Sequence, residues 1–244
     1  MMKIKGLLFD LNGTVIDILT NEADDQLFRV CANFLDYYGV KIDSWKLKEL
    51  YFELNHEQRS RSPEKFPEFD VADIFREIIK RYSTVKVKNP SELAKSAAVV
   101  FRAASRFQLQ LYPLVSETLE VLQKDYKMAA LSDGQTLWAV PELTSLGLDK
   151  FFSAVLVSGD YGFRKPDPRF FEMALKKMKL TAEEVIFIGN DMYRDVYGAA
   201  NAGMKTVFFK SNQGDHSYHG VEPDYIIYNF NELLQAVDFL QSHN

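Results

Sequence analysis

Residues with oxygen-bearing side chains directly follow several short apolar segments of this 244-residue chain. Five residues share this position: Asp10, Ser132, Asp133, Asn190 and Asp191. A carboxylate can attack phosphorus and form an acyl phosphate, which splits a hydrolysis into two easier steps. Mg²⁺ prefers hard oxygen ligands and is usually held by one or two carboxylates together with substrate phosphate. These residue types therefore indicate hydrolysis of a phosphorylated compound, with Asp10 and Asp191 as available carboxylates.

The apolar segments before these residues are predicted to be strands of one parallel sheet. Strands are expected at residues 4–9, 127–131, 154–157, 185–188, 206–209 and 224–227. Helices are expected at residues 114–125, 135–146, 168–178, 195–202 and 230–240. Short apolar strands that alternate with helices are typical of an α/β fold whose parallel sheet is covered on both faces. Ligands of such doubly wound, Rossmann-like sheets bind outside the carboxyl ends of the strands, so the polar residues are expected to converge on one crevice.

The segment between the first predicted strand and Pro113 has a helical pattern instead. From residue 21 to about residue 107 no convincing strand is visible, and helices are expected near residues 27–38, 44–54, 71–82 and 90–104. Because this insert begins just after Asp10, its natural position is a lid over the crevice. We therefore expect a discontinuous core domain of residues 1–17 and 112–244 and a helical cap domain of residues 18–111.

The composition is that of an ordinary globular protein with a real core. Apolar residues make up 47% of the chain, and 19 Phe and 12 Tyr supply bulk for packing. The net charge of −5 disfavours nucleic acid as a partner, because a phosphate backbone requires a basic surface. A small anionic substrate remains compatible with it, since one pocket can be locally positive.

Cysteine content and hydropathy bear on the compartment. The single cysteine, Cys31, excludes an internal disulfide and fits a reducing environment. No window approaches the roughly 20 apolar residues of a membrane span, and the N-terminal segment is too short in apolar residues for a signal peptide. We expect a soluble, cytoplasmic protein without a membrane partner, either a monomer or a homodimer.

Four stretches resemble the motifs of the haloacid dehalogenase superfamily. Residues 7–14 read Leu-Leu-Phe-Asp-Leu-Asn-Gly-Thr, and residues 128–134 read Met-Ala-Ala-Leu-Ser-Asp-Gly. Residues 162–168 read Gly-Phe-Arg-Lys-Pro-Asp-Pro, and residues 186–195 read Ile-Phe-Ile-Gly-Asn-Asp-Met-Tyr-Arg-Asp. Any one of them alone is a weak signal. Together they occur in the order of the family and cover nearly all of the predicted core.

The resemblance implies a phosphatase mechanism and assigns roles to individual residues. Asp10 would be the nucleophile, and Lys165 would neutralise charge on the transferring phosphoryl group. The Ser132 hydroxyl and the backbone N–H of Asp133 would donate hydrogen bonds to its oxygens. Mg²⁺ would be held by Asp10, by the backbone carbonyl of Asn12 and by acidic or amide side chains of the fourth motif. The register of that motif leaves three candidates open: Asn190, Asp191 and Asp195.

Asn12 is the main departure from the family pattern. Phosphatases of the family usually have a second aspartate there, which protonates the leaving group and then activates water. An amide has no titratable proton in the working range, and positioned proton transfer typically contributes about 10²–10⁴-fold. Three explanations fit: leaving groups that need little protonation, another residue or water in that role, or a slow or silent enzyme.

Two other functions compete with the phosphatase hypothesis. A 2-haloacid dehalogenase also uses an aspartate nucleophile, but dehalogenases of the family carry a bulky aromatic residue two positions later and do not need Mg²⁺. A catalytically impaired, ligand-binding protein of the same fold is the second alternative. Basic residues of the insert could grip a substrate carboxylate or a second phosphate, or form a solvated helix face. They are Arg59, Arg61, Arg102 and Arg106.

Overall fold

Six short strands form one sheet in the computed structural model, which describes residues 3–243. In spatial order they are β5 (Val155–Val157), β4 (Lys127–Ser132), β1 (Gly6–Phe9), β6 (Val185–Gly189), β7 (Lys205–Phe209) and β8 (Tyr225–Ile227). All neighbouring pairs are parallel, and β1 lies between β4 and β6. The predicted α/β fold with a doubly wound parallel sheet is therefore confirmed.

Helices cover both faces of this sheet, as the alternation of side chains along β1 illustrates. Leu7 and Phe9 pack into one apolar cluster, while Leu8 packs into a different one on the opposite face. The first cluster includes residues of α5 (Val115–Leu122) and α9 (Leu233–Ser242). The second includes residues of α7 (Pro168–Met178) and α8 (Gly198–Asn201). Burial on both faces explains why the strands are continuous apolar runs.

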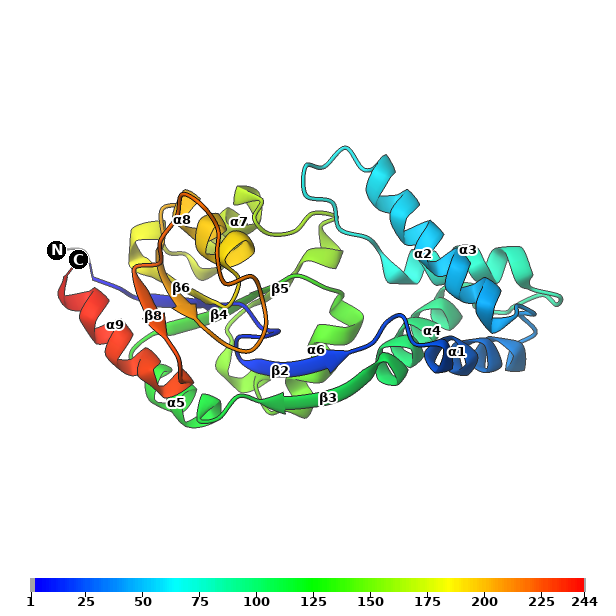
Figure 1. Ribbon diagram of the computed structural model, residues 1–244, viewed down its shortest axis with the longest axis horizontal. Coiled ribbons are helices and arrows are strands. Elements are labelled where there is room, and N and C mark those ends of the chain that lie inside the picture. The colour runs from blue at the N-terminus through cyan, green and yellow to red at the C-terminus, as the bar shows by residue number, and fades with distance from the viewer. Residues whose placement is uncertain (1–2, 244) are drawn as a thin grey trace.

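Four helices form a separate bundle at one end of the molecule, away from both chain termini (Figure 1). They are α1 (Asp25–Tyr37), α2 (Ser44–Arg61), α3 (Val71–Tyr82) and α4 (Pro90–Ser105). Their apolar faces build a cluster of their own around Tyr51 and Phe101, whose rings stack at 4.4 Å. Trp138 of α6 (Thr136–Ser145) also belongs to this cluster. The helical bundle (residues 25–105) thus packs against the sheet domain through α6.

Two antiparallel strands, β2 (Ile16–Thr20) and β3 (Arg106–Leu111), connect the bundle to the sheet domain, and the sequence analysis predicted neither of them. The helical pattern was expected to run from residue 21 to about residue 107, but β3 already begins at Arg106. Leu109 and Leu111 alternate with glutamines that face Asp17: Gln108 and Gln110 donate to its carboxylate at 2.6 and 3.0 Å. A period of two over only six residues was too short a signal to recognise.

A second difference concerns the segment after β6. A helix was predicted at residues 195–202, but a π-helical turn begins at Met192 and runs to Tyr197, and α8 follows. Such turns are frequent at functional sites.

Within residues 3–243 no helix is both long and apolar enough to span a membrane.

Candidate active site

Asp10 lies at the carboxyl end of the central strand β1 and is nearly buried. Its backbone N–H donates to the carbonyl of Ile188 at 2.9 Å, which continues the pairing of β1 with β6. One carboxylate oxygen, Oδ1, accepts a hydrogen bond from Lys165 Nζ at 2.6 Å. The other, Oδ2, accepts from the Thr14 hydroxyl at 2.8 Å. The carboxylate is thereby held in one orientation.

Lys165 is buried between two carboxylates. Its Nζ lies 2.6 Å from Asp10 and 2.7 Å from Asp195, and its own side chain is only 2% exposed. Burial by itself would lower the pKa of this ammonium, but the carboxylates of Asp10, Asp195 and Asp133 outweigh burial and raise it. Lys165 is therefore a buried ammonium that places a positive charge beside Asp10.

Asp195 positions both Lys165 and the loop after β6. Its Oδ1 accepts from Lys165, while its Oδ2 accepts from the backbone N–H groups of Asn190 at 3.0 Å and Asp191 at 3.1 Å. Burial raises the pKa of Asp195 to about 7, against the lowering effect of the Lys165 charge. A Cβ at Gly189 would lie 2.4 Å from the Asp195 side chain, so only glycine fits there. Both Asp195 oxygens are thus engaged within the protein.

Asp191 begins the helical segment that follows β6. Its Oδ1 accepts from the backbone N–H groups of Tyr193 at 3.0 Å and Arg194 at 2.7 Å. Its Oδ2 accepts from Arg194 Nε at 2.9 Å. This is the arrangement of a helix N-cap combined with an ion pair, and it accounts for an acid at this position without a metal.

Asn190 is a fourth-motif residue whose side chain is linked to Asp10 through Thr14. Its Oδ1 is 3.0 Å from the Thr14 hydroxyl, which also contacts Asp10. The amide is confined by the backbone, since a Cβ at Gly13 would lie 2.3 Å from its Nδ2. One hydroxyl therefore joins the carboxylate of Asp10 to the amide of Asn190.

The oxygen donors at this edge fit a divalent ion only sparsely. Among residues 3–243 no group of three or more His, Cys, Asp and Glu side chains is arranged to hold a metal. The Lys165 ammonium lies between the carboxylates of Asp10 and Asp195, and the Asp191 carboxylate is ion-paired with Arg194. One carboxylate, that of Asp10, remains with neutral oxygens near it. One protein carboxylate is the smallest number that Mg²⁺ sites usually have; such sites complete the coordination with several waters and with substrate phosphate.

Ser132 is the last residue of β4, and Asp133 follows it. Ser132 is buried, and its hydroxyl makes only a 3.3 Å hydrogen bond with the carbonyl of Asp133. Asp133 Oδ1 accepts from the backbone N–H of Lys165 at 3.0 Å. Its Oδ2 is buried without a hydrogen-bond partner, with Arg194 Nη1 at 3.8 Å. Burial raises the pKa of Asp133, and the nearby Lys165 charge opposes that rise. The Asp133 side chain therefore positions the loop that carries Lys165. The sequence analysis had predicted a role only for the backbone N–H of Asp133.

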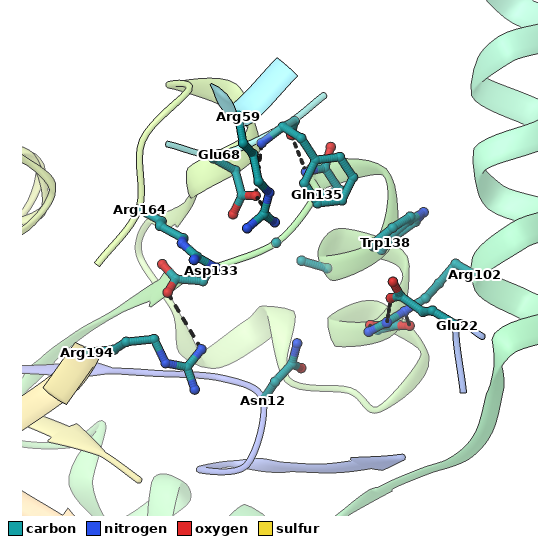
Figure 2. Close-up of a pocket in the computed structure, with 14 residues that line it drawn as sticks. Asn12, Glu22, Arg59, Glu68, Arg102, Asp133, Gln135, Trp138, Arg164 and Arg194 are labelled. Atoms are coloured by element: carbon teal, nitrogen blue, oxygen red, sulfur yellow. Dashed lines mark hydrogen bonds and ion pairs between the residues drawn. The ribbon is translucent and has the colours of Figure 1, made fainter. Parts of the chain in front are cut away.

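A cavity of about 250 Å³ lies between this edge of the sheet and the helical bundle (Figure 2). Its wall is mostly polar and charged: Asn12, Glu22, Arg59, Glu68, Phe69, Arg102, Asp133, Gly134, Gln135, Trp138, Ala139, Glu142, Arg164 and Arg194. Asp10 and Lys165 are buried and do not belong to the wall. Asn12 and Asp133, neighbours of Asp10 and Ser132, thus face the bundle across this cavity.

The structure divides the four arginines singled out from the sequence. Arg59 and Arg102 line the cavity, whereas Arg61 and Arg106 do not. Arg164 and Arg194 also line it, although sequence reasoning did not single them out. Their position inside the third and fourth motifs was the available signal, since each stands within one residue of a predicted site residue.

Comparison with known proteins extends this geometry. A family model described as haloacid dehalogenase-like hydrolase matches residues 7–209. A protein of Pyrococcus furiosus named glyceraldehyde 3-phosphate phosphatase is 29% identical over 246 residues, covering 100% of this chain and 96% of the relative. A 2-haloacid dehalogenase of Pseudomonas syringae has the same fold, with a TM-score of 0.71, 23% identity and coverage of 97% and 99%. A phosphatase of Thermococcus onnurineus superposes with a TM-score of 0.61 at 23% identity, covering 96% and 98%.

Proposed function

Because the chain belongs to the family of haloacid dehalogenase-like hydrolases, we propose that it hydrolyses a small phosphorylated metabolite with Asp10 as the nucleophile. The membership predicted from four motifs is confirmed by the match over residues 7–209. One observation carries the proposed function: the Asp10 carboxylate is clamped by the Lys165 ammonium and the Thr14 hydroxyl at the carboxyl edge of the sheet. The similarity to a glyceraldehyde 3-phosphate phosphatase favours phosphorus over a halogenated carbon as the centre attacked.

The proposed reaction proceeds in two steps. The Asp10 carboxylate attacks phosphorus, the P–O bond to the leaving group breaks with its electron pair, and an aspartyl phosphate forms. The departing alkoxide takes a proton from solvent water and leaves as the alcohol. Water then attacks that phosphorus, which releases inorganic phosphate and restores Asp10. Lys165 offsets the negative charge of the phosphoryl group, and the Ser132 hydroxyl, which has only one long internal bond, is free to donate to its oxygens.

Mg²⁺ is the cofactor we propose for this site. Asp10, the backbone carbonyl of Asn12 and the Asn190 amide oxygen would hold it, while Asp191 and Asp195 keep their structural partners. A bound Mg²⁺ would supply positive charge opposite the phosphoryl oxygens. The proposal is supported by the donor types, and a single carboxylate implies weak affinity.

Replacing Asn190 with aspartate should strengthen metal binding. A second carboxylate beside Asp10 adds attraction for a divalent cation, so the Mg²⁺ concentration for half-maximal activity should fall about tenfold. A Mg²⁺ titration of phosphatase activity measures this change. The exposed Asn201 in α8 provides the control, because Asn201→Asp adds the same charge away from the site. An unchanged midpoint for Asn190→Asp would show that this side chain does not bind the ion.

Asn12→Asp should raise the turnover of alkyl phosphates by at least about tenfold, because it restores a titratable group at the cavity wall. Figure 2 shows the Asn12 side chain entering the cavity from the loop after β1. Acetyl phosphate has a better leaving group, so its kcat/KM, which reports formation of the aspartyl phosphate, should gain less. Steady-state rates for both substrates test the prediction, with Asn201→Asp as the control. A variant no faster than the parent would place the proton donor elsewhere.

A metal-independent dehalogenase is the second candidate, favoured by the absence, among residues 3–243, of a group of three or more His, Cys, Asp and Glu side chains that could hold a metal, and by the similarity in fold to a 2-haloacid dehalogenase. A screen of phosphate esters and 2-chloropropionate, with Mg²⁺ and with EDTA, separates the two functions. Phosphate release that EDTA abolishes supports the proposed phosphatase, and chloride release in EDTA supports the dehalogenase. Binding of phosphate compounds without turnover of either substrate would indicate a ligand-binding protein.

A further inference from the structure

Two arginines from different parts of the chain meet at the cavity. Arg59 lies in the last turn of α2, and Arg164 lies on the loop that carries Lys165. Backbone hydrogen bonds join that loop to the bundle: Arg164 N–H donates to Phe66 at 3.0 Å, and Glu68 N–H donates to Gly162 at 2.9 Å. The position of Arg164 is therefore fixed at the junction of the bundle with the sheet domain.

The Arg59 guanidinium has few hydrogen-bond acceptors around it. Its Nη2 lies 3.3 Å from Glu68 Oε1, an oxygen that also accepts from the Phe69 backbone at 3.0 Å. The other Glu68 oxygen is taken by the Ser158 hydroxyl at 2.8 Å. Arg59 Nε is buried and has no hydrogen-bond partner. Burial lowers the pKa of Arg59, and the positive charge of Arg164 lowers it further. A buried N–H group without an acceptor is costly, so a ligand oxygen within reach of Arg59 Nε would be stabilised there.

Arg164 has no carboxylate partner within residues 3–243. The other two arginines of the wall are matched: Arg102 makes two hydrogen bonds with Glu142 at 2.8 and 3.1 Å, and Arg194 is paired with Asp191 at 2.9 Å. Arg164 makes no ion pair, although its charge is close enough to affect Arg59. Of the wall arginines, Arg164 thus lacks a carboxylate partner, and Arg59 has only Glu68, whose oxygens also accept from the Phe69 backbone and the Ser158 hydroxyl.

We propose that Arg59 and Arg164 bind a carboxylate group of the substrate, at the end remote from the phosphoryl group. The proposal rests on the phosphatase function proposed above. A guanidinium group matches a carboxylate through paired N–H donors, and two of them from separate segments would fix its orientation. A single negative charge is favoured over a second phosphate, because Glu22, Glu68 and Glu142 also line the cavity and would repel a dianion more strongly.

The substrate class follows from the arrangement of the wall. Figure 2 shows Asn12 and Arg59 on opposite sides of the cavity, with Arg164 beside Asp133. A volume of about 250 Å³ accommodates a small phosphorylated carboxylic acid. Because the carboxylate would contact both the bundle and the sheet domain, its binding would also hold the two together. The enzyme would therefore discriminate against phosphate esters with an uncharged end.

A matched pair of substrates tests this discrimination. 3-Phosphoglycerate and glycerol 3-phosphate have the same number of carbons and differ by a carboxylate in place of a hydroxymethyl group. For the native chain, kcat/KM should favour 3-phosphoglycerate by at least about tenfold, mainly through KM, because charge-assisted hydrogen bonds form only with the acid. Arg164→Gln and Arg59→Gln should each remove most of this preference. Arg164→Lys, which keeps the charge but loses the paired donors, should retain part of it.

Arg61→Gln is the matched control, since Arg61 lies two residues from Arg59 but is 77% exposed and outside the cavity. It should keep the full preference. Calorimetry of both ligands with the Asp10→Asn chain measures binding independently of turnover. Tighter binding of 3-phosphoglycerate that is lost in Arg164→Gln supports the subsite even if no ester is hydrolysed, in which case only the phosphatase function fails. Equal binding of the two ligands, or a preference that survives Arg164→Gln, overturns the subsite.

Discussion

Replacing Asp10 with asparagine should lower the hydrolysis of phosphate esters by at least about 10⁴-fold, because an amide cannot form the acyl phosphate. The change is nearly isosteric. The amide oxygen can still accept a hydrogen bond from the Lys165 ammonium, so the loop after β1 should keep its conformation. Activity should therefore be lost without loss of the fold. Rates at saturating substrate, together with thermal unfolding curves, measure the two effects separately.

The same variant identifies the covalent intermediate. In the native chain the aspartyl phosphate should accumulate, because Asn12 cannot activate the water that hydrolyses it. Acid quenching of a reaction with labelled substrate, followed by peptide mapping, should place the label on Asp10, and Asp10→Asn should carry none. Asp125→Asn, at an exposed turn after α5, is the control and should label normally. Label on another residue, or full activity in Asp10→Asn, would contradict the assignment of the nucleophile.

The edge of the sheet that carries the site could be predicted from local patterns alone. A strand buried on both faces is a short run of apolar residues, and the first polar residue after it marks where the strand ends. Asp10 after Phe9 and Ser132 after Leu131 are examples. Parallel strands bring such positions to a common edge whatever their separation in sequence. The structure accordingly joins Asp10, after β1, to Asn190, after β6, through the Thr14 hydroxyl at 2.8 and 3.0 Å.

The different hydrogen-bond partners of Asp191 and Asp195 could not be predicted from such local patterns. Asp191 and Asp195 have the same side chain and stand four residues apart, so their sequence context is nearly alike. Their roles depend on which donors the fold places around each. Asp195 receives Lys165 and two backbone N–H groups, while Asp191 receives Arg194. The same limitation applies to Arg164, whose missing partner becomes visible only when the loop is seen against the helical bundle.

Lys165→Met should strongly lower activity and also destabilise the protein. An ordinary exposed loop lysine would show neither effect when replaced. Without the ammonium, nothing offsets the charge that Asp10 and the phosphoryl group bring together, and a loss of at least about 10³-fold is expected. The substitution also leaves Asp10 and Asp195 buried without their shared cation. Removing one partner of a buried ion pair typically costs about 3–5 kcal/mol.

The pH dependence of that destabilisation tests its physical cause. Burial raises the pKa of Asp195 to about 7 even with Lys165 present, and removal of the ammonium should raise it further. A carboxyl group whose pKa is higher in the folded than in the unfolded protein favours folding when protonated. Its contribution is lost as the pH rises. The stability gap between native chain and variant should therefore widen from pH 5 to pH 8.

Urea unfolding at the two pH values, in EDTA, measures the gap. Lys205→Met is the matched control, because Lys205 forms a 2.8 Å ion pair with Asp224 but is 41% exposed. An exposed pair contributes at most about 1 kcal/mol, so this variant should lose little stability at either pH. If Lys165→Met behaves like Lys205→Met, the buried triad of one ammonium and two carboxylates does not exist in solution. The electrostatic basis for placing a phosphoryl group at Asp10 would then be lost as well.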